Sequence, residues 1–232
     1  MDIVIPYKAN QHNGTELKFA LRSIEKYLTG YRGVWIIGDL PKGINTDKVF
    51  YIQASHDPNR KEWDICSKIL KACELPVISE NFIMWHDDHL LLKPLDVSEI
   101  KAWHNGPLEN ELKRTRSAYK QAVENTLKIF QWAEPLNFDI HVPCIFNKHD
   151  FQRINTPAEW KNELCLKSLY FNCGSEAEYM DDLKINQTGL SKEKIYSAIK
   201  DRLFFSTGPL AMEYHMTEVL KELYPEPSKY GC

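Results

Sequence analysis

The chain has 232 residues, of which 43% are hydrophobic, and this is enough apolar material for one well-buried core. Its 29 basic and 32 acidic residues nearly cancel, so no overall field would attract nucleic acid or anionic lipid. No apolar run approaches the roughly 20 residues that cross a bilayer, and the first residues lack the pattern of a signal peptide. We therefore expect a cytoplasmic protein with no membrane span.

The first third of the chain alternates between strand and helix patterns. Asp2–Tyr7 has the alternation of a short strand, and Thr15–Leu28 carries apolar residues at helical spacing before Gly30. Val34–Ile37 and Val49–Ile52 are short apolar runs typical of buried strands. This order predicts the start of an α/β sheet.

The next strand leads directly to the most polar motif of the chain. Lys61–Glu74 predicts a helix that ends before Pro76, and Phe82–Trp85 predicts the strand that follows. That strand runs into His86–His89, two carboxylates between two imidazoles. Ligands of open α/β sheets bind at the carboxyl ends of the strands, so this motif is a candidate site.

A polar segment follows, from about residue 99 to residue 135. Its pattern predicts a long inserted helix, with Lys113, Arg114, Arg116 and Lys120 on its surface. Such a charge run is more typical of a solvated face than of a binding patch. We interpret the chain as one domain, residues 1–232, with this insertion inside it.

The remainder of the chain predicts a strand and two helices. The strand pattern returns at Phe138–Phe146, and helix patterns cover Lys192–Arg202 and Leu210–Leu223. The segment Tyr224–Tyr230 predicts an extended tail at the surface. Six cysteines are scattered without a C-x-x-C pair, so we expect them to be reduced and mostly buried.

Asp87 and Asp88 are the first candidate site residues. Carboxylate oxygens are the ligands that Mg²⁺ and Mn²⁺ prefer, and such a cation neutralises the diphosphate of a nucleotide sugar. One carboxylate would bind the metal, and the other a ribose hydroxyl or a metal-bound water. The alternative is a helix cap or a turn, where aspartate is common. The flanking His86 and His89 favour the site interpretation.

Two further groups follow later in the chain. Strand alternation would place Asp139 and His141 on one face, with His141 either a metal ligand, a general base or a hydrogen-bonded core histidine. Asp181 and Asp182 either hold an acceptor or act as a base, or cap an exposed turn. The sequence contains no P-loop and no H-E-x-x-H or G-x-S-x-G motif, so triphosphatase and hydrolase functions have no support.

Four segments, in order, resemble the Stealth family of capsular-polysaccharide and N-acetylglucosamine phosphotransferases. They are Asn13–Tyr27, Val34–Asp39, Asn81–Asp88 and His141–Pro143. The resemblance covers about half of the chain and implies a GT-A-like core, a Rossmann-type mixed sheet flanked by helices. Its more distant small relatives are glycosyltransferases, many of them from phages and bacteria, and the chain resembles such a small member. The opening segment Ile3–Lys8 is closer to the first strand of ordinary GT-A glycosyltransferases, which places glycosyl transfer ahead of sugar-1-phosphate transfer.

The resemblance implies that Arg22 and Asp39 lie near the donor, that Asp87 and Asp88 serve the metal and the diphosphate, and that His141 belongs to the site. Together with the residue patterns above, it leads to the following predicted roles. Asp87, Asp88 and His141 would bind Mn²⁺ or Mg²⁺, and Asp88, His141 and Asp182 would serve catalysis. The residues near a UDP- or GDP-linked sugar would be Tyr7, Lys8, Arg22, Asp39 and Asp87. The acceptor hydroxyl would belong to a polysaccharide, a lipid-linked sugar, a protein or a hydroxymethylated DNA base. A non-catalytic carbohydrate- or nucleotide-binding module is the remaining alternative.

Overall fold

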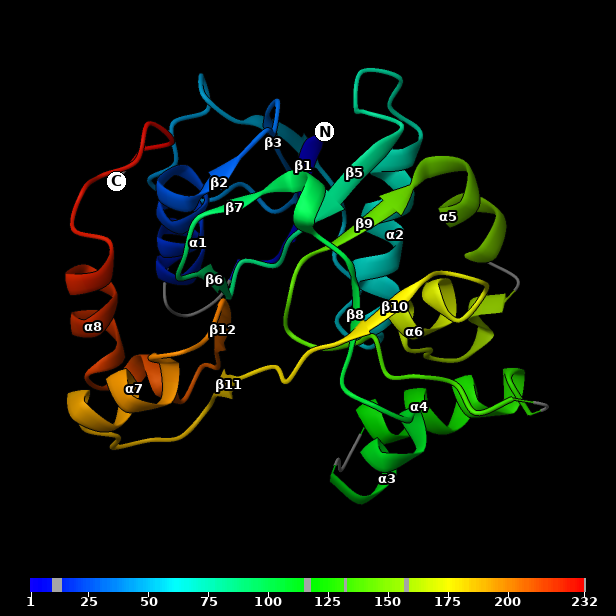
Figure 1. The fold of residues 1–232 in the computed structure, drawn as a ribbon. Coiled ribbons are helices and arrows are strands. Elements are labelled where there is room, and N and C mark those ends of the chain that lie inside the picture. Colours follow the sequence, from blue (N-terminus) through cyan, green and yellow to red (C-terminus); the bar gives the residue numbers. More distant parts are fainter. Residues whose placement is uncertain (10–13, 115–117, 132, 157–158, 232) are drawn as a thin grey trace.

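A computed structural model describes residues 1–9, 14–114, 118–131, 133–156 and 159–231. At its centre lies a five-stranded sheet with the strand order β4-β3-β1-β5-β9 (Figure 1). The first four of these strands run parallel, and β9 runs antiparallel to β5. Their bounds are Asp2–Tyr7 for β1, Val34–Gly38 for β3, Phe50–Gln53 for β4, Asn81–Met84 for β5 and Cys144–Asn147 for β9.

Helices cover both faces of this sheet, which is why its central strands are continuous apolar runs. On one face, Ile3 and Ile5 of β1 pack in one cluster with Leu17 and Leu21 of helix α1. On the other face, Val4 packs with the second layer of helices. The helices are α1 (Thr15–Tyr27) on the first face, and α2 (Lys61–Cys73), α5 (Lys148–Ile154) and α6 (Leu166–Phe171) on the second.

A small second sheet begins where the polar motif ends. It has the order β11-β12-β6, and β6 starts at His89. Two helices and a 3-10 turn pack on it around Leu90 and Phe205, beside α1 in Figure 1. The bounds are His89–Leu91 for β6, Lys184–Ile185 for β11, Phe204–Thr207 for β12, Lys192–Ile199 for α7, Ala211–Glu213 for η4 and Met216–Leu223 for α8.

The segment from about residue 99 to residue 135 is not one long helix. A short strand, Gly106 with a φ of 113°, and Pro107 come before its helical part, of which residues 111–114 and 118–129 are described as helix. Two pairs of short strands, β2 with β7 and β8 with β10, complete the fold. The remaining bounds are Leu28–Thr29 (β2), Leu95–Asp96 (β7), Val97–Glu99 (η1), Ala102–His104 (β8), Leu108–Asn110 (η2), Glu111–Arg114 (α3), Ala118–Ile129 (α4), Glu159–Lys161 (η3) and Ala177–Tyr179 (β10).

The strand expected over Phe138–Phe146 forms only from Cys144 onward. The chain before it is irregular because its polar groups bond to helix α6. The Phe138 amide donates to Ser168 Oγ, and Asp139 accepts from the amides of Lys167 and Ser168. Asp139 and His141 therefore do not share a strand face.

One expectation about the last part of the chain was wrong. The helix expected over Leu210–Leu223 is split by Tyr214, whose φ of −129° and ψ of −136° are not helical. The tail lies along the surface as expected, with Pro225–Pro227 and Lys229 exposed, but its end tyrosines anchor it, because Tyr224 and Tyr230 are 1% and 2% exposed. The Tyr230 hydroxyl lies 2.8 Å from that of Tyr31.

Two other expectations agree with the described residues. The five described cysteines are free, and all of them except Cys173 are buried. Among the described helices, none combines the length and hydropathy that a bilayer span requires.

Candidate functional site

A cavity of about 510 Å³ lies at the carboxyl end of β5. Its walls come from α2, from α3 and α4, from α6 and from the segment that enters β11. Charged and polar side chains dominate the lining, among them Lys61, Glu62, Arg114, Tyr119, Lys167 and Lys184. A cavity with this many ionisable groups suits a polar ligand.

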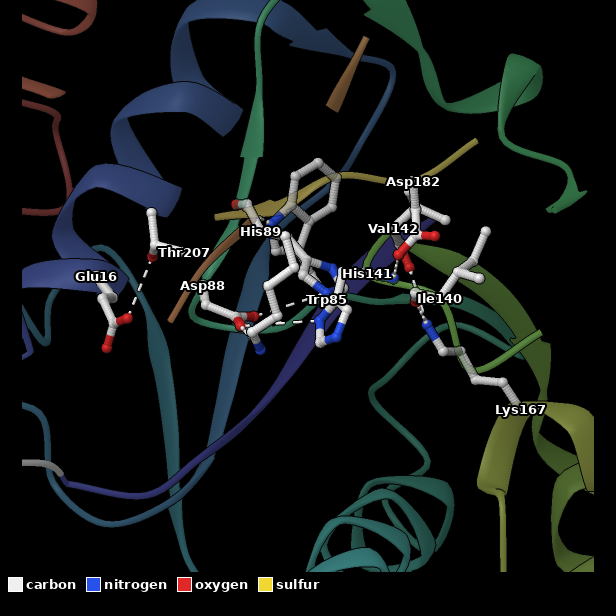
Figure 2. Close-up of polar contacts among 11 residues, drawn as sticks. Glu16, Trp85, Asp88, His89, Ile140, His141, Val142, Lys167, Asp182 and Thr207 are labelled. Atoms are coloured by element: carbon white, nitrogen blue, oxygen red, sulfur yellow. Dashed lines mark hydrogen bonds and ion pairs between the residues drawn. The ribbon is translucent and has the colours of Figure 1, made fainter. Parts of the chain in front are cut away.

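Three side chains with metal-ligating atoms meet beside this cavity. Asp88 Oδ1 lies 3.7 Å from His89 Nε2, and Asp88 Oδ2 lies 3.9 Å from His141 Nδ1 (Figure 2). One ligand atom from each residue lies within 4.8 Å of the others. Asp88 and His141, both predicted from the sequence as metal ligands, therefore lie close together with His89, and their binding of a metal stays a prediction.

The surroundings of His89 fit a bound cation. Its side chain is fully buried, and neither ring nitrogen has a hydrogen-bond partner among the described residues. Burial lowers the pKa of His89 and of His141 well below the usual value, so both rings are neutral at neutral pH. A neutral imidazole offers the lone pair that a metal ion needs.

The two adjacent aspartates have opposite electrostatic surroundings. Burial raises the pKa of Asp87 well above its usual value, and the charges of Asp88 and Glu16 add to the effect. Burial acts in the same sense on Asp88, but Lys184, His141 and His86 outweigh it and lower the Asp88 pKa. Asp87 is not part of the Asp88, His89 and His141 group, so its role as a metal ligand stays a prediction.

Lys184 supplies the positive charge nearest to Asp88. Its Nζ atom donates to Asp88 Oδ2 over 3.1 Å. Lys184 is in β11, two residues after Asp182, and both side chains line the cavity. An ammonium group thus lies beside the same carboxylate oxygen that faces His141.

Neighbouring groups hold His141 in place through its backbone (Figure 2). The His141 amide donates to Asp182 Oδ2 over 3.2 Å, and Asp182 Oδ1 accepts from Asn105. The buried Lys167 Nζ donates to the carbonyls of Ile140 and Val142, on either side of His141. Asp182 therefore contacts the backbone of His141, a candidate metal ligand, and also faces the cavity.

The predicted donor residues of β1 and β3 lie side by side at the carboxyl edge of the sheet. Asp39 Oδ2 accepts from the Ala9 amide over 2.8 Å, so the loop after Tyr7 and the end of β3 are joined. Burial raises the pKa of Tyr7 to about 12, with contributions from Asp87 and Asp39. Lys8 is exposed on the same loop.

Some predicted residues lie elsewhere. Arg22 donates to the Tyr224 carbonyl and stacks over Phe19, so the structure does not bring it to the cavity. Asp181 pairs with Arg202 at 2.7 Å. Asn13 and Arg116 are outside the described residues.

Several site residues were not predicted from the sequence. Glu62 and Lys61 line the cavity from the first turn of α2, and their place at a helix start near the sheet edge is the signal that would have suggested them. No comparable pattern marks Lys167 or Lys184. Lys167 contacts a carbonyl 27 residues earlier in the chain, and Lys184 contacts Asp88, 96 residues earlier. The neighbouring residues of either lysine give no sign of these contacts.

The sequence matches no protein-family model and no curated protein, so the Stealth resemblance is unconfirmed. Among solved structures, the chain is similar to the galactosyltransferase LgtC in complex with donor and acceptor sugar analogs, at 13% identity and a TM-score of 0.57. An active-site mutant of LgtC gives 11% identity and a TM-score of 0.56. Each comparison covers 99% of this chain and 97% of the other. The predicted fold class is therefore confirmed, because the chain has the GT-A fold of LgtC, a parallel-rich α/β sheet flanked by helices.

Proposed function

We propose that the chain is a metal-assisted glycosyltransferase that moves a sugar from a UDP- or GDP-linked donor to a hydroxyl acceptor. The observation that carries the proposal is the Asp88, His89 and His141 group at the carboxyl edge of the sheet. It occurs in a fold shared with a galactosyltransferase. The two unpartnered nitrogens of buried His89 support a cation at this position.

The proposed cation is Mn²⁺ or Mg²⁺, held by Asp88, His89 and His141. Bound there, it would neutralise the charge that develops on the departing nucleoside diphosphate. Tyr7, Lys8, Asp39 and Asp87 would bind the nucleotide part of the donor, since they follow or end the strands of the same edge.

The cavity would hold the sugar and the acceptor. Asp182 faces it and also accepts the His141 amide, so we propose that Asp182 positions His141 and contacts the acceptor hydroxyl. Polysaccharide, lipid-linked sugar, protein and modified DNA remain the candidate acceptors. The DNA candidate relies on Lys113, Arg114 and Lys120, which are exposed on α3 and α4.

A binding screen followed by a product assay tests the proposal. Nucleotide sugars are added with and without Mn²⁺, and a bound donor raises the melting temperature by mass action. Each stabilising donor is then incubated with candidate acceptors. Release of a nucleoside diphosphate supports glycosyl transfer, whereas release of the monophosphate indicates sugar-1-phosphate transfer. Binding without turnover would indicate a non-catalytic module, and the absence of any nucleotide binding would refute the proposal.

A further inference from the structure

Lys184 contacts an Asp88 oxygen that also belongs to the proposed metal site of Asp88, His89 and His141. Lys184 Nζ lies 3.1 Å from Asp88 Oδ2, and the same oxygen faces His141 Nδ1 at 3.9 Å. A divalent cation bound to this oxygen would lie next to the ammonium group, and like charges at such a separation repel strongly. The two cations therefore compete for Asp88 unless an anion lies between them.

The sheet pairing explains how Lys184 reaches this position. Lys184 pairs with Ser206 of β12, and Ser206 pairs with His89 of β6. Side chains in register on neighbouring strands project from the same face, so Lys184 and His89 flank Ser206 on the cavity side. The buried Ser206 hydroxyl has no hydrogen-bond partner among the described residues, which leaves a polar atom between the two.

We propose that Lys184 acts as an exchangeable counter-cation: it pairs with Asp88 when no donor is bound and turns to the diphosphate when metal and donor bind together. This inference rests on the proposed function, and it identifies the residue that couples the two ligands. The side chain of Lys184 is 31% exposed, so its ammonium group can leave Asp88 without entering an apolar environment.

The proposal has a thermodynamic signature. Lys184 opposes metal binding in the absence of nucleotide, because the metal must displace it from Asp88. It favours metal binding in the presence of nucleotide, because it then contacts the added anion. Coupling between two ligands is reciprocal, so the same residue makes Mn²⁺ raise the affinity for nucleotide.

The experiment measures the affinity for Mn²⁺ and the affinity for nucleotide in the wild-type protein and in Lys184→Gln. Electron paramagnetic resonance of free Mn²⁺ gives the metal affinity without nucleotide, and calorimetry gives the affinities for UDP and for GDP with Mn²⁺ present. We expect Lys184→Gln to bind Mn²⁺ about 5-fold more tightly and to bind the nucleotide about 10-fold more weakly, within the usual range of coupling energies. Lys184→Arg keeps the charge and should retain most of the coupling.

Lys192→Gln is the matched control. Lys192 of α7 pairs with Glu218 and Glu222 of α8 and does not line the cavity, so its removal should leave both affinities unchanged. If Lys184→Gln shifts both affinities in the same direction, or shifts neither, the inference is overturned while the proposed function stands. If the wild-type protein binds neither Mn²⁺ nor nucleotide, the proposed function and this inference are both refuted. Melting curves of the three variants confirm that each one is folded.

Discussion

Asp87 and Asp88 are neighbours in the sequence with different surroundings in the structure. Asp88 lies among His89, His141 and Lys184, while Asp87 is influenced by the charges of Asp88 and Glu16. Asp88 is therefore held in its charged form, whereas the neighbouring Asp87 keeps its proton to a higher pH.

Asp88→Asn should abolish turnover and leave the fold intact. It removes the carboxylate of the proposed metal site formed by Asp88, His89 and His141 and should reduce Mn²⁺ affinity by at least the roughly 10–100-fold known for loss of an outer-shell partner. Mn²⁺ titration measures the change. Asp87→Asn is the matched control, with an expected smaller effect on the metal. An equal loss in both variants would place Asp87 among the ligands.

Glu62 should make stability depend on pH. Burial raises the pKa of Glu62 to about 7, with Asp139 and Glu163 adding to the shift and Lys61 and Lys167 opposing it. The folded state then binds the proton more tightly than the unfolded state does. Stability should therefore fall as the pH rises from about 4.5 to about 7 and should not change further above that.

Urea unfolding of the wild-type protein and Glu62→Gln at pH 5 and pH 8 tests this expectation. The glutamine variant lacks the titration, so its free energy of unfolding relative to wild type should rise by about 1–3 kcal/mol between the two pH values. A difference that is constant with pH would show that Glu62 titrates normally.

At the scale of elements, helix α6 fixes the segment that carries His141. Asp139 accepts from the first amides of the helix, and Lys167 donates back to carbonyls on both sides of His141. The segment and the helix thus hold each other through side chains. His141 would lose its alignment with Asp88 if these contacts were removed.

Lys167→Met should lower both stability and Mn²⁺ affinity. It leaves two carbonyls without their donor, at a cost of about 1–3 kcal/mol, and it frees the His141 segment. Lys148→Met is the matched control, since Lys148 is also buried and donates to two carbonyls, those of Leu75 and Ile78. It should lose similar stability by urea unfolding without a change in Mn²⁺ affinity. A similar loss of metal binding in both variants would contradict a specific role for Lys167.

Elements with strong local signals were predictable from the sequence. The apolar runs of β1, β3 and β5 and the helical spacing of α1 and α2 each depend on neighbouring residues, and all five formed. The strand expected over Phe138–Phe146 was wrong in its first half because this part bonds to α6, about 30 residues later: the Phe138 amide donates to Ser168 Oγ, and Asp139 accepts from the first amides of the helix. Asp88 was predicted because it follows a buried strand, whereas Lys184 lies in a two-residue strand whose pairing has no local signal.

At the scale of the whole molecule, the segment after α8 closes the core of the first sheet. Tyr230 packs in the same cluster as Ile3 and Leu17, and its carbonyl accepts the Asn45 amide over 2.6 Å. A residue near one end of the described chain thus contributes to the packing of the first strand and the first helix.

Tyr230→Ala should therefore destabilise the protein by about 3–5 kcal/mol, as for other large buried aromatic side chains. Tyr230→Phe removes only the contact with the Tyr31 hydroxyl and should cost about 1 kcal/mol. Tyr214→Ala is the control, because Tyr214 is 52% exposed and should change stability little. Chemical unfolding gives the free energy of unfolding of the three variants. A small effect of Tyr230→Ala would mean that packing of the tail contributes little to the stability of the core.

The second sheet holds Lys184, Ser206 and His89 in one row, and the Thr207 amide of the same sheet donates to the Asp88 carbonyl. Because the backbone of this row is tied by strand pairing, a move of the Lys184 ammonium needs side-chain rotation alone. Such rotations take picoseconds to nanoseconds, whereas enzymes commonly turn over about 1 to 1,000 times per second. The Lys184 side chain would therefore move between Asp88 and the diphosphate many thousands of times within one catalytic cycle. This exchange would stay at equilibrium, so Lys184 would affect the Mn²⁺ and nucleotide affinities without limiting the rate of turnover.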